Sequence, residues 1–472
     1  AELAISDRYN REGVSFQFDF LNDSLDKLPQ GLKSALEQNK PIIFFLNPPY
    51  ATTCNFGDKN KAEEGNDTII NDVMKEKGMK RCSDNLYAQF LYRIMLIKEQ
   101  YNLTNIHIAL FSPTLFLTGS SFESFRNVFF KEFAFNGGVQ FKASHFADVA
   151  DSWGISFSIW NNGETTDKNK FNYALIDNID GEIKEVGKKV VYNIDGQKTA
   201  SLWAKEDVKK NKTEDAPQMT SGINYKPNKD GCRGNLVKNA LGFYYNNSNN
   251  VDKNAQNVGM FTSCFSSGTG CSILPINFDK CTALFSARKL IEKNWVNSKD
   301  EYLAPNEEHD KYQEFVNDSI VYSLFHSASN QSSLRQVEYK DKLWDIKNEF
   351  FFMSKNDIMQ LANDYGFDFT FNDANVSNER YVYTKLQGIE LSQEAKAVLN
   401  MAIDLVNASF KYREMFDEEH PEYQIMNWDA SYYQLKAMWK EYMPEALKEF
   451  NELYKKLADK MRPMVYELGF LK

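Results

Sequence analysis

The sequence is poor in metal-ligand patterns and in long apolar runs. Its 472 residues include six Cys without a CxxC pair and five His without i, i+4 spacing. A disulfide scaffold and a zinc site are therefore not predicted, and the thiols are expected to be reduced. The apolar run Ile42 to Leu46 is far too short for a membrane span or a signal peptide. We expect a cytoplasmic protein with no metal and no membrane partner.

An excess of basic charge is also lacking. The chain has 55 Lys+Arg against 65 Asp+Glu, a net charge of −10, whereas a general polyanion binder is normally basic. Aromatic residues are abundant, with 36 Phe, 24 Tyr and 7 Trp, which excludes intrinsic disorder. The length predicts two or three folded domains.

The first third of the chain has an α/β pattern. Apolar runs that read as strands alternate with helical stretches, and polar residues follow the strands. The expected strands are 14–20, 41–46, 106–111, 138–143 and 155–160, and the expected helices are 28–38, 86–100 and 122–133. This order is typical of a doubly wound, Rossmann-like sheet, which binds ligands at the carboxyl ends of its strands. We place this domain at 1–162.

The remainder differs in texture. Residues 163–390 mix short strands with polar turns, beginning with a hairpin around Asp180-Gly181, and predict an α+β region. Residues 391–472 read as helices, with Ser392, Asp429 and Pro444 as their start signals. The Asn-rich stretch 244–257 is expected to be a solvated loop.

The tetrapeptide Asn47-Pro48-Pro49-Tyr50 follows a buried strand and suits one reaction. The exocyclic amine of adenine or cytosine is a poor nucleophile because its lone pair is delocalised into the ring. An Asn oxygen and a rigid backbone carbonyl before a proline, both accepting from that amine, favour a localised lone pair. The Tyr50 ring offers a stacking face for a base that has been flipped out of the duplex.

Further pieces occur in a fixed order around this motif: Asp19-Phe20 before it, 86–93 and Ala109 to Pro113 after it, and Phe146 to Val149 before the last short strand. Together they resemble the adenine-specific, amino-group DNA methyltransferases of restriction-modification systems. The resemblance implies that Asn47 and the Pro48 carbonyl activate the target amine, with Pro49 stiffening the turn, and that Tyr50 and Phe146 sandwich the adenine. It assigns Asp19 and Phe20 to the adenine pocket of S-adenosylmethionine. The part after residue 162 is then the target-recognition region for double-stranded DNA.

One part of the family pattern is missing. No Gly-rich strand-to-helix turn precedes Asp19, and Gly268-Thr269-Gly270 follows no recognisable strand. The resemblance therefore implies that an upstream polypeptide segment completes the cofactor site, and that this chain by itself lacks half of it.

Basic residues concentrate between 183 and 238. This segment holds 12 basic and 7 acidic residues, a net charge of +5, so the rest of the chain carries −15. Phosphates attract such a segment without reading sequence. The candidates for DNA contact are Lys205, Lys209, Lys210, Lys212, Lys226, Arg233 and, in a polar stretch further on, Arg335.

Other functions stay open. A non-catalytic DNA-recognition module or fragment fits a chain without the Gly-rich turn, and so does the methylase half of a combined restriction endonuclease and methyltransferase. A nuclease within the chain would use Glu182-Ile-Lys184 with Asp177 or Asp180, or Glu338-Tyr-Lys340 with Asp318. Such acid-x-Lys triplets are frequent in charged sequences, and a hairpin strand accounts for the first of them. No Cys follows a Pro, as a cytosine-C5 methyltransferase would need.

Overall fold

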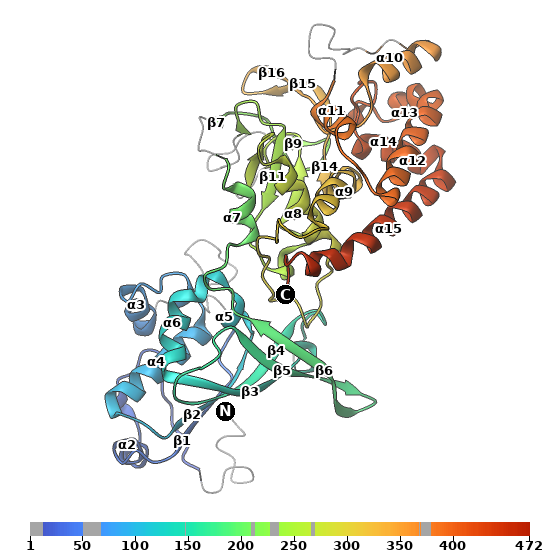
Figure 1. Cartoon of the computed structure of the whole chain (residues 1–472). Helices are drawn as coiled ribbons and strands as arrows, with labels where there is room; N and C mark the ends of the chain where they lie inside the picture. The colour runs from blue at the N-terminus through green and yellow to red at the C-terminus, as the bar shows by residue number, and fades with distance from the viewer. Residues whose placement is uncertain are drawn as a thin grey trace. The chain divides into compact units, whose positions relative to one another are not determined.

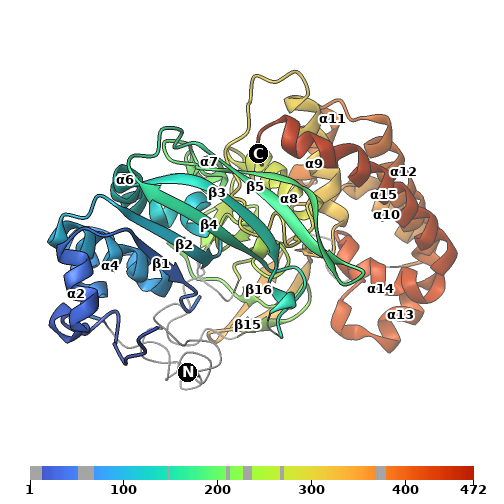
Figure 2. The same cartoon turned by 90° about the horizontal axis from the view of Figure 1, so that it is seen from below.

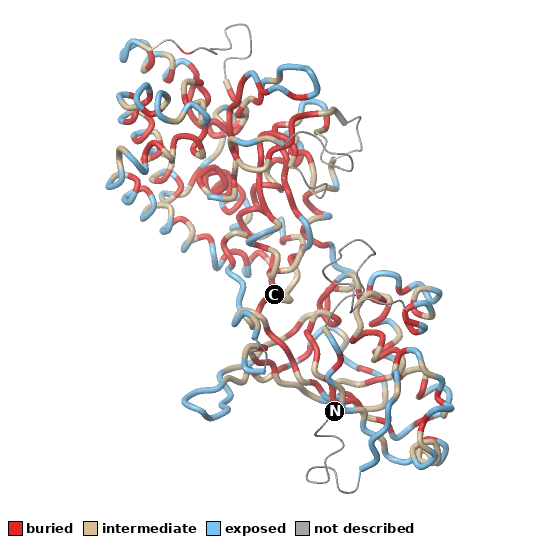
Figure 3. The backbone as a smooth tube through the Cα atoms, turned by 180° about the vertical axis from the view of Figure 1, so that it is seen from behind, coloured by how far each residue is buried: buried red, intermediate tan, exposed pale blue. Residues whose placement is uncertain are grey.

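The computed structural model describes residues 13–50, 68–146, 148–208, 213–226, 236–265, 270–367, 369 and 379–472. The chain divides into two compact units (Figure 1). Unit 1 comprises Ala1–Gly196 and Lys293–Asp300, and unit 2 comprises Gln197–Glu292 and Glu301–Lys472. Buried residues gather inside each unit (Figure 3). The fold is mixed α/β, and no described helix has the length and apolar character needed to cross a membrane.

Unit 1 is built on a six-stranded sheet with the strand order β1-β2-β4-β3-β5-β6. Its strands are β1 (Ile42–Leu46), β2 (Ile106–Ser112), β3 (Phe133–Lys142), β4 (Gly154–Asn162), β5 (Lys170–Ile179) and β6 (Glu182–Tyr192). Its helices are α2 (Gln30–Glu37), α3 (Ile69–Glu76), α4 (Leu86–Tyr101), α5 (Leu115–Thr118) and α6 (Glu123–Glu132).

The sheet is mixed, because β4 runs against both of its neighbours. β1 pairs with β2 and β3 pairs with β5 in parallel, whereas β4 is antiparallel to β2 and to β3, and β6 is antiparallel to β5. It follows that β1, β2, β3 and β5 all point the same way. Their carboxyl ends share one edge of the sheet, where ligands of open α/β sheets bind.

The described helices cover one face of this sheet (Figures 1 and 2). Alternate residues of β1 face these helices: Ile42 and Phe44 pack into a core with residues of α3, α4 and α6. The intervening Ile43 and Phe45 are each 68% exposed on the other face. Side chains of a strand alternate between the two faces, so an apolar run puts apolar side chains on both.

The segment Lys293–Asp300 joins unit 1 through β3 and β4. The Gln140 side-chain amide donates to the carbonyls of Trp295, at 2.7 Å, and Val296, at 3.2 Å. At Gly154, an added Cβ would lie 1.9 Å from the Trp295 carbonyl oxygen. Glycine is therefore required there for the backbones to approach.

Most of the expected elements of unit 1 are confirmed, with three differences. Residues 14–20 form no strand, although Phe18 and Phe20 pack against the helix-side core. The sheet is mixed, not the parallel one expected. The expected boundary near residue 162 falls inside the sheet, since β5 and β6 extend it to Tyr192.

Unit 2 combines small sheets with a helical layer. A four-stranded sheet has the order β13-β11-β12-β14, and three two-stranded pairs accompany it. The strands are β7 (Thr213–Glu214), β8 (Gln218–Met219), β9 (Tyr225–Lys226), β10 (Leu236–Val237), β11 (Gly242–Asn246), β12 (Val258–Phe261), β13 (Cys271–Ile273), β14 (Ser329–Asn330), β15 (Leu334–Tyr339) and β16 (Lys342–Ile346). The helices are α7 (Ala200–Lys205), α8 (Phe278–Leu290), α9 (Tyr312–Phe325), α10 (Lys355–Asp364), α11 (Tyr381–Gln387), α12 (Gln393–Ser409), α13 (Arg413–Glu419), α14 (Tyr432–Tyr442) and α15 (Pro444–Glu467).

One core joins the C-terminal helices to the rest of unit 2. Residues of α12, α14 and α15 share it with residues of α8, α9 and β12. The helical segment expected at 391–472 is therefore an integral part of this unit.

The Asn-rich stretch of unit 2 is folded around a buried side chain, which the sequence did not predict. The Arg288 guanidinium donates to Asn254 Oδ1 at 2.9 Å, to the Ser248 carbonyl at 2.5 Å and to the Asn250 carbonyl at 3.0 Å. The loop thus supplies acceptors that a buried guanidinium needs.

Candidate functional site

Asn47-Pro48-Pro49-Tyr50 lies at the carboxyl edge of the unit 1 sheet, directly after β1. Asn47 and Pro49 are exposed, Pro48 is buried and Tyr50 is half-buried. The Tyr50 hydroxyl donates to Asn47 Oδ1 at 2.6 Å. Burial raises the pKa of Tyr50 to about 12, so this hydroxyl stays protonated at neutral pH. Asn47 thus presents its side-chain oxygen as an acceptor at the carboxyl edge of the sheet, and in this structure the Tyr50 hydroxyl occupies that acceptor.

The Tyr50 ring belongs to an aromatic cluster on the helix-free face, which is the sheet face opposite the described helices. It packs with Phe141, Ala143 and Ile155, and its ring centroid lies 6.2 Å from that of Trp153 in an edge-on arrangement. Trp153 was not predicted as a site residue. Its signal was its place in the loop that also carries Phe146, immediately before β4.

Phe146 lies in the loop between β3 and β4, at the same edge of the sheet. Its ring is 77% exposed, and its centroid is 5.3 Å from that of Phe141, to whose cluster Tyr50 also belongs. The structure therefore attaches both predicted stacking residues to one aromatic cluster. A planar ring brought to this edge would find aromatic faces in reach.

Asp19 and Phe20 precede β1 in the chain, and Phe20 packs on the helix-covered face of the sheet, opposite the aromatic cluster. The Phe20 ring stacks on Phe90 at 5.2 Å and belongs to the core on the helix-covered face. The Asp19 carboxylate is exposed and accepts from the backbone N–H groups of Leu21, at 3.1 Å, and Asn22, at 3.2 Å. This carboxylate therefore organises a local turn.

A charged group stands at the ends of β3 and β5. Asp177 accepts from Lys142 Nζ at 2.6 Å and contacts His145 Nε2 at 2.7 Å. The hydrogen bond from Lys142, helped by the one from His145, lowers the pKa of Asp177 to about 2. The carboxylate is thus ionised and paired near the aromatic cluster.

Two cavities among the described residues of unit 1 are large enough to compare. One of about 390 Å³ lies at the carboxyl edge, on the helix-free face, and is lined by residues of the aromatic cluster together with Phe146 and Asp177. A larger one of about 680 Å³ lies at the opposite edge, where α4 and α6 end, lined by Tyr92, Glu99 and Lys131 among others. Of these two, the smaller cavity is the one that adjoins the candidate site.

The residues predicted to contact DNA do not form one described surface. Lys209, Lys210, Lys212 and Arg233 lie outside the described residues. Lys205 is the last residue of α7 and is half-buried, and Lys226 lies in β9. The basic segment is divided between the two units at Gly196, and its Lys189 forms an ion pair with Asp300.

The prediction that Arg335 contacts DNA is wrong, because this side chain is buried and does not face solvent. It is 1% exposed, and its guanidinium donates to both carboxylate oxygens of Asp429, at 3.1 and 3.3 Å. Arg380 donates to the same carboxylate at 2.8 Å. Buried charges require such partners, so Arg335 stabilises unit 2 and cannot reach a base edge in this fold.

Three of the acids named for the nuclease alternative have basic partners. Glu182 forms an ion pair with Lys184 at 3.0 Å, and the Asp177 carboxylate is held by Lys142 and His145. Asp318 is buried and accepts from Lys460 at 2.7 Å. These contacts account for Glu182, Asp177 and Asp318 as structural groups.

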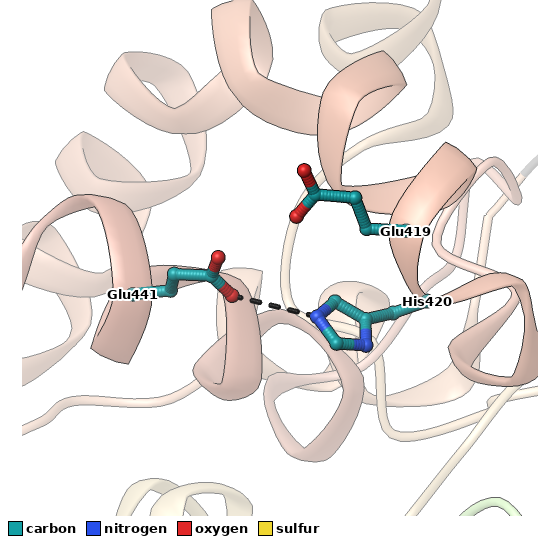
Figure 4. A group of neighbouring side chains, drawn as sticks. All are labelled: Glu419, His420 and Glu441. Carbon is teal, nitrogen blue, oxygen red and sulfur yellow. Dashed lines mark ion pairs between the residues drawn. The ribbon is translucent and has the colours of Figure 1, made fainter.

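A group of three possible metal ligands lies in unit 2 (Figure 4). Ligand atoms of Glu419, His420 and Glu441 all lie within 4.8 Å of one another, and His420 Nε2 faces a Glu441 oxygen at 3.6 Å. The His420 ring also packs on Phe416, with centroids 4.7 Å apart. Two exposed carboxylates around a surface imidazole are explained by ordinary charge pairing.

Comparison with family models and with curated proteins assigns no function to the chain. No protein-family model matches the chain, and no curated protein shows significant similarity to it. Function therefore has to be argued from the site.

Proposed function

We propose that the protein is an adenine-specific DNA methyltransferase of a restriction-modification system. It would transfer a methyl group from S-adenosylmethionine to the exocyclic amine of adenine within a specific double-stranded sequence. The observation that carries this proposal is the position of Asn47-Pro48-Pro49-Tyr50 at the carboxyl edge of the sheet, beside an aromatic cluster. The α/β order of strands and helices in unit 1 also supports a Rossmann-like methyltransferase domain.

The roles follow from the contacts. A target amine would donate to Asn47 Oδ1, replacing the Tyr50 hydroxyl that now donates there, and to the carbonyl of Pro48. Two acceptors on one NH2 group localise the nitrogen lone pair for attack. Tyr50 would hold one face of the extruded adenine, and Phe146, which is exposed, would close on the other.

The residues expected to bind the cofactor fit it only in part. Phe20 is already stacked on Phe90, and the Asp19 carboxylate already accepts from two backbone amides. The 472 residues contain no Gly-rich turn that follows a strand to hold the rest of S-adenosylmethionine. We therefore derive no step from these two residues.

The test is to express the naturally occurring protein in a bacterial host without adenine methylation, and to map N6-methyladenine in its genome. We expect one short sequence to be modified at nearly all occurrences. Asn47→Ala should reduce modification by about 100-fold or more. Asn105→Ala, at an exposed position next to the amino end of β2, is the matched control and should leave modification unchanged.

The absent Gly-rich turn specifically favours the second candidate, a DNA-recognition module without catalysis. Such a protein would bind DNA of a defined sequence but would leave no methyl mark. A stably folded, DNA-binding protein that leaves the genome unmodified would replace our proposal with this one.

A further inference from the structure

Two thiols of unit 2 lie in contact, away from the candidate site. Cys271 is the first residue of β13, and Cys281 lies in the first turn of α8. Both are free cysteines, and their side chains share a hydrogen bond. Cys271 is half-buried, whereas Cys281 is fully buried. A disulfide needs the sulfur atoms about 2 Å apart, and two thiols that already share a hydrogen bond are a short movement from that distance.

The turn between the two thiols is held in place by the buried Asn277. Its side-chain amide donates to the Ser272 carbonyl at 3.2 Å and to Cys271 Sγ at 4.0 Å, and its Oδ1 accepts from the Leu274 backbone N–H at 2.7 Å. The Asn277 carbonyl accepts from the Cys281 backbone N–H at 2.9 Å. Because the turn is already ordered, joining the two sulfur atoms requires little further ordering of the chain.

The surroundings of Cys271 favour its thiolate, which is the form of a thiol that attacks disulfides. The hydrogen bond from Cys281 lowers the pKa of Cys271, and the charge of Lys205 at the end of α7 lowers it further, while burial opposes both. Cys281 has the opposite character, since its hydrogen bond with Cys271 and its burial raise its pKa. Cys271 is therefore the first nucleophile of the pair.

A buried hydroxyl also stands beside the pair. Tyr244 lies opposite Cys271 where β11 pairs with β13, and its side chain interacts electrostatically with Cys271 and Cys281. Its hydroxyl is buried and has no hydrogen-bond partner among the residues that the structure describes. Burial raises the pKa of Tyr244, so the hydroxyl remains a proton donor. An unpaired donor in the interior is costly, and a thiolate on Cys271 would give it an acceptor.

We propose that Cys271 and Cys281 form a reversible thiol–disulfide site for low-molecular-weight disulfides. The Cys271 thiolate attacks one sulfur of the small disulfide, whose S–S bond breaks; one half stays on Cys271, and the other leaves as a thiol after taking up the proton that Cys271 lost. Cys281 then attacks Cys271 Sγ, the mixed disulfide breaks, and the second half leaves with the proton of Cys281. The dithiol of the protein is oxidised by two electrons, and the small disulfide is reduced to two thiols. The site uses none of the residues assigned to methyl transfer.

Oxidation of the folded, full chain by glutathione disulfide tests the site. The remaining thiols are blocked with N-ethylmaleimide, and trypsin then places Cys271 in the peptide 254–280 and Cys281 in the peptide 281–288. Mass spectrometry should find the two peptides joined, lighter than their sum by two hydrogen atoms, and a dithiol reductant should separate them. Failure of the folded protein to form this joined pair would overturn the proposal.

Cys264 provides the matched control, because it is a buried thiol of unit 2 within the same peptide 254–280. The joined peptides should persist in Cys264→Ser and be absent from Cys271→Ser. A joined pair that needs Cys264 and survives Cys271→Ser would assign the disulfide to the wrong cysteine and refute the proposed pair.

The order of attack is tested in two single variants, each checked for folding by circular dichroism. Cys281→Ser should accumulate the glutathionyl mixed disulfide on Cys271, because the second attack is then impossible. Cys271→Ser should leave Cys281 unmodified, because this thiol is fully buried. A glutathionyl group on Cys281 and none on Cys271 would reverse the assigned roles.

The role of Lys205 is tested by the pH profile of the first attack. Lys205→Gln should shift the profile to higher pH and slow the attack at neutral pH by about threefold to tenfold, because the thiolate fraction falls. Lys342→Gln, at an exposed position of β16, should leave the profile unchanged. Identical profiles for the two variants would contradict the effect of Lys205 on Cys271.

Discussion

Replacement of one buried carboxylate should severely weaken unit 2. Asp429 is fully buried and is the shared partner of Arg335 and Arg380, each no more than 1% exposed. It also accepts from Ser333 Oγ and from the Asn348 backbone N–H. Asp429→Asn keeps the size of the side chain but removes the charge that faces two buried guanidinium groups. Removing one member of a buried ion pair costs about 3–5 kcal/mol.

Urea unfolding monitored by tryptophan fluorescence and circular dichroism measures this loss. Trp428 lies next to the substitution, and the Arg380 guanidinium stands 4.5 Å from its ring centroid. Asp404→Asn, at an exposed position of α12, is the control and should change the free energy of unfolding by less than about 0.5 kcal/mol. A loss below about 1 kcal/mol for Asp429→Asn would mean that the pair is solvated, and would restore Arg335 as a candidate for DNA contact.

Three other predictions concern the site and the dependence of stability on pH. Tyr50→Phe keeps the ring and frees Asn47 Oδ1, so methylation should persist, whereas Tyr50→Ala should reduce it by about ten- to a hundredfold through lost stacking; equal impairment in the genomic assay would contradict the stacking role. The pKa of Asp177 is lowered from 3.8 to about 2 by Lys142 and His145, so its stabilising effect is complete above pH 4 and is lost as the pH falls towards 2. Asp177→Asn should flatten the stability of unit 1 over this interval in urea titrations, and an unchanged slope would refute the assignment. Burial lowers the pKa of His326 from 6.5 to about 3, so the unfolded chain binds the extra proton, and unit 2 should lose stability as the pH falls below 6.5. His326→Asn should reduce that loss, and a loss equal to that of the parent protein would show that His326 is not its cause.

Local patterns in the sequence predicted the elements that depend on near neighbours. The apolar run before Asn47 is β1, and the stretch from Leu86 is α4. The Asp180-Gly181 turn joins β5 and β6 with φ values of 55° and 86°, the positive angles that a two-residue hairpin requires. Each of these features is encoded within a few residues.

Features set by distant neighbours were not predictable. Residues 14–20 alternate as a strand does, but a strand needs a partner, and here only Phe18 and Phe20 pack against the helix-side core, whereas residues 13–17 are exposed. The antiparallel direction of β4 depends on the length and path of the loop that holds Phe146. The inclusion of Lys293–Asp300 in unit 1 depends on Gln140 and Gly154, more than 130 residues earlier in the chain.

The candidate site shows the same division. The place of Asn47 to Tyr50 at the carboxyl edge follows from β1 alone, because a motif after a strand lies where the strand ends. The packing of Trp153 against Tyr50 could not be predicted in this way, because it depends on the pairing of β4 with β2. Asp19 has the position expected from the order of motifs, but its carboxylate accepts hydrogen bonds from the backbone N–H groups of its own turn.

Five of the eight arginines that the structure describes are buried, and this bears on how the proposed methyltransferase would read DNA. Of its 11 arginines, five are less than 2% exposed: Arg126, Arg288, Arg335, Arg380 and Arg413. A guanidinium has five donors in a fixed fork, which suits it to clusters of buried carbonyl and carboxylate oxygens. Since these five arginines lie in the interior, contact with phosphates would depend on the lysines and the remaining arginines, and such contacts attract the backbone without reading sequence. Base reading would then depend on neutral amides, and an amide pairs with adenine more naturally than with guanine.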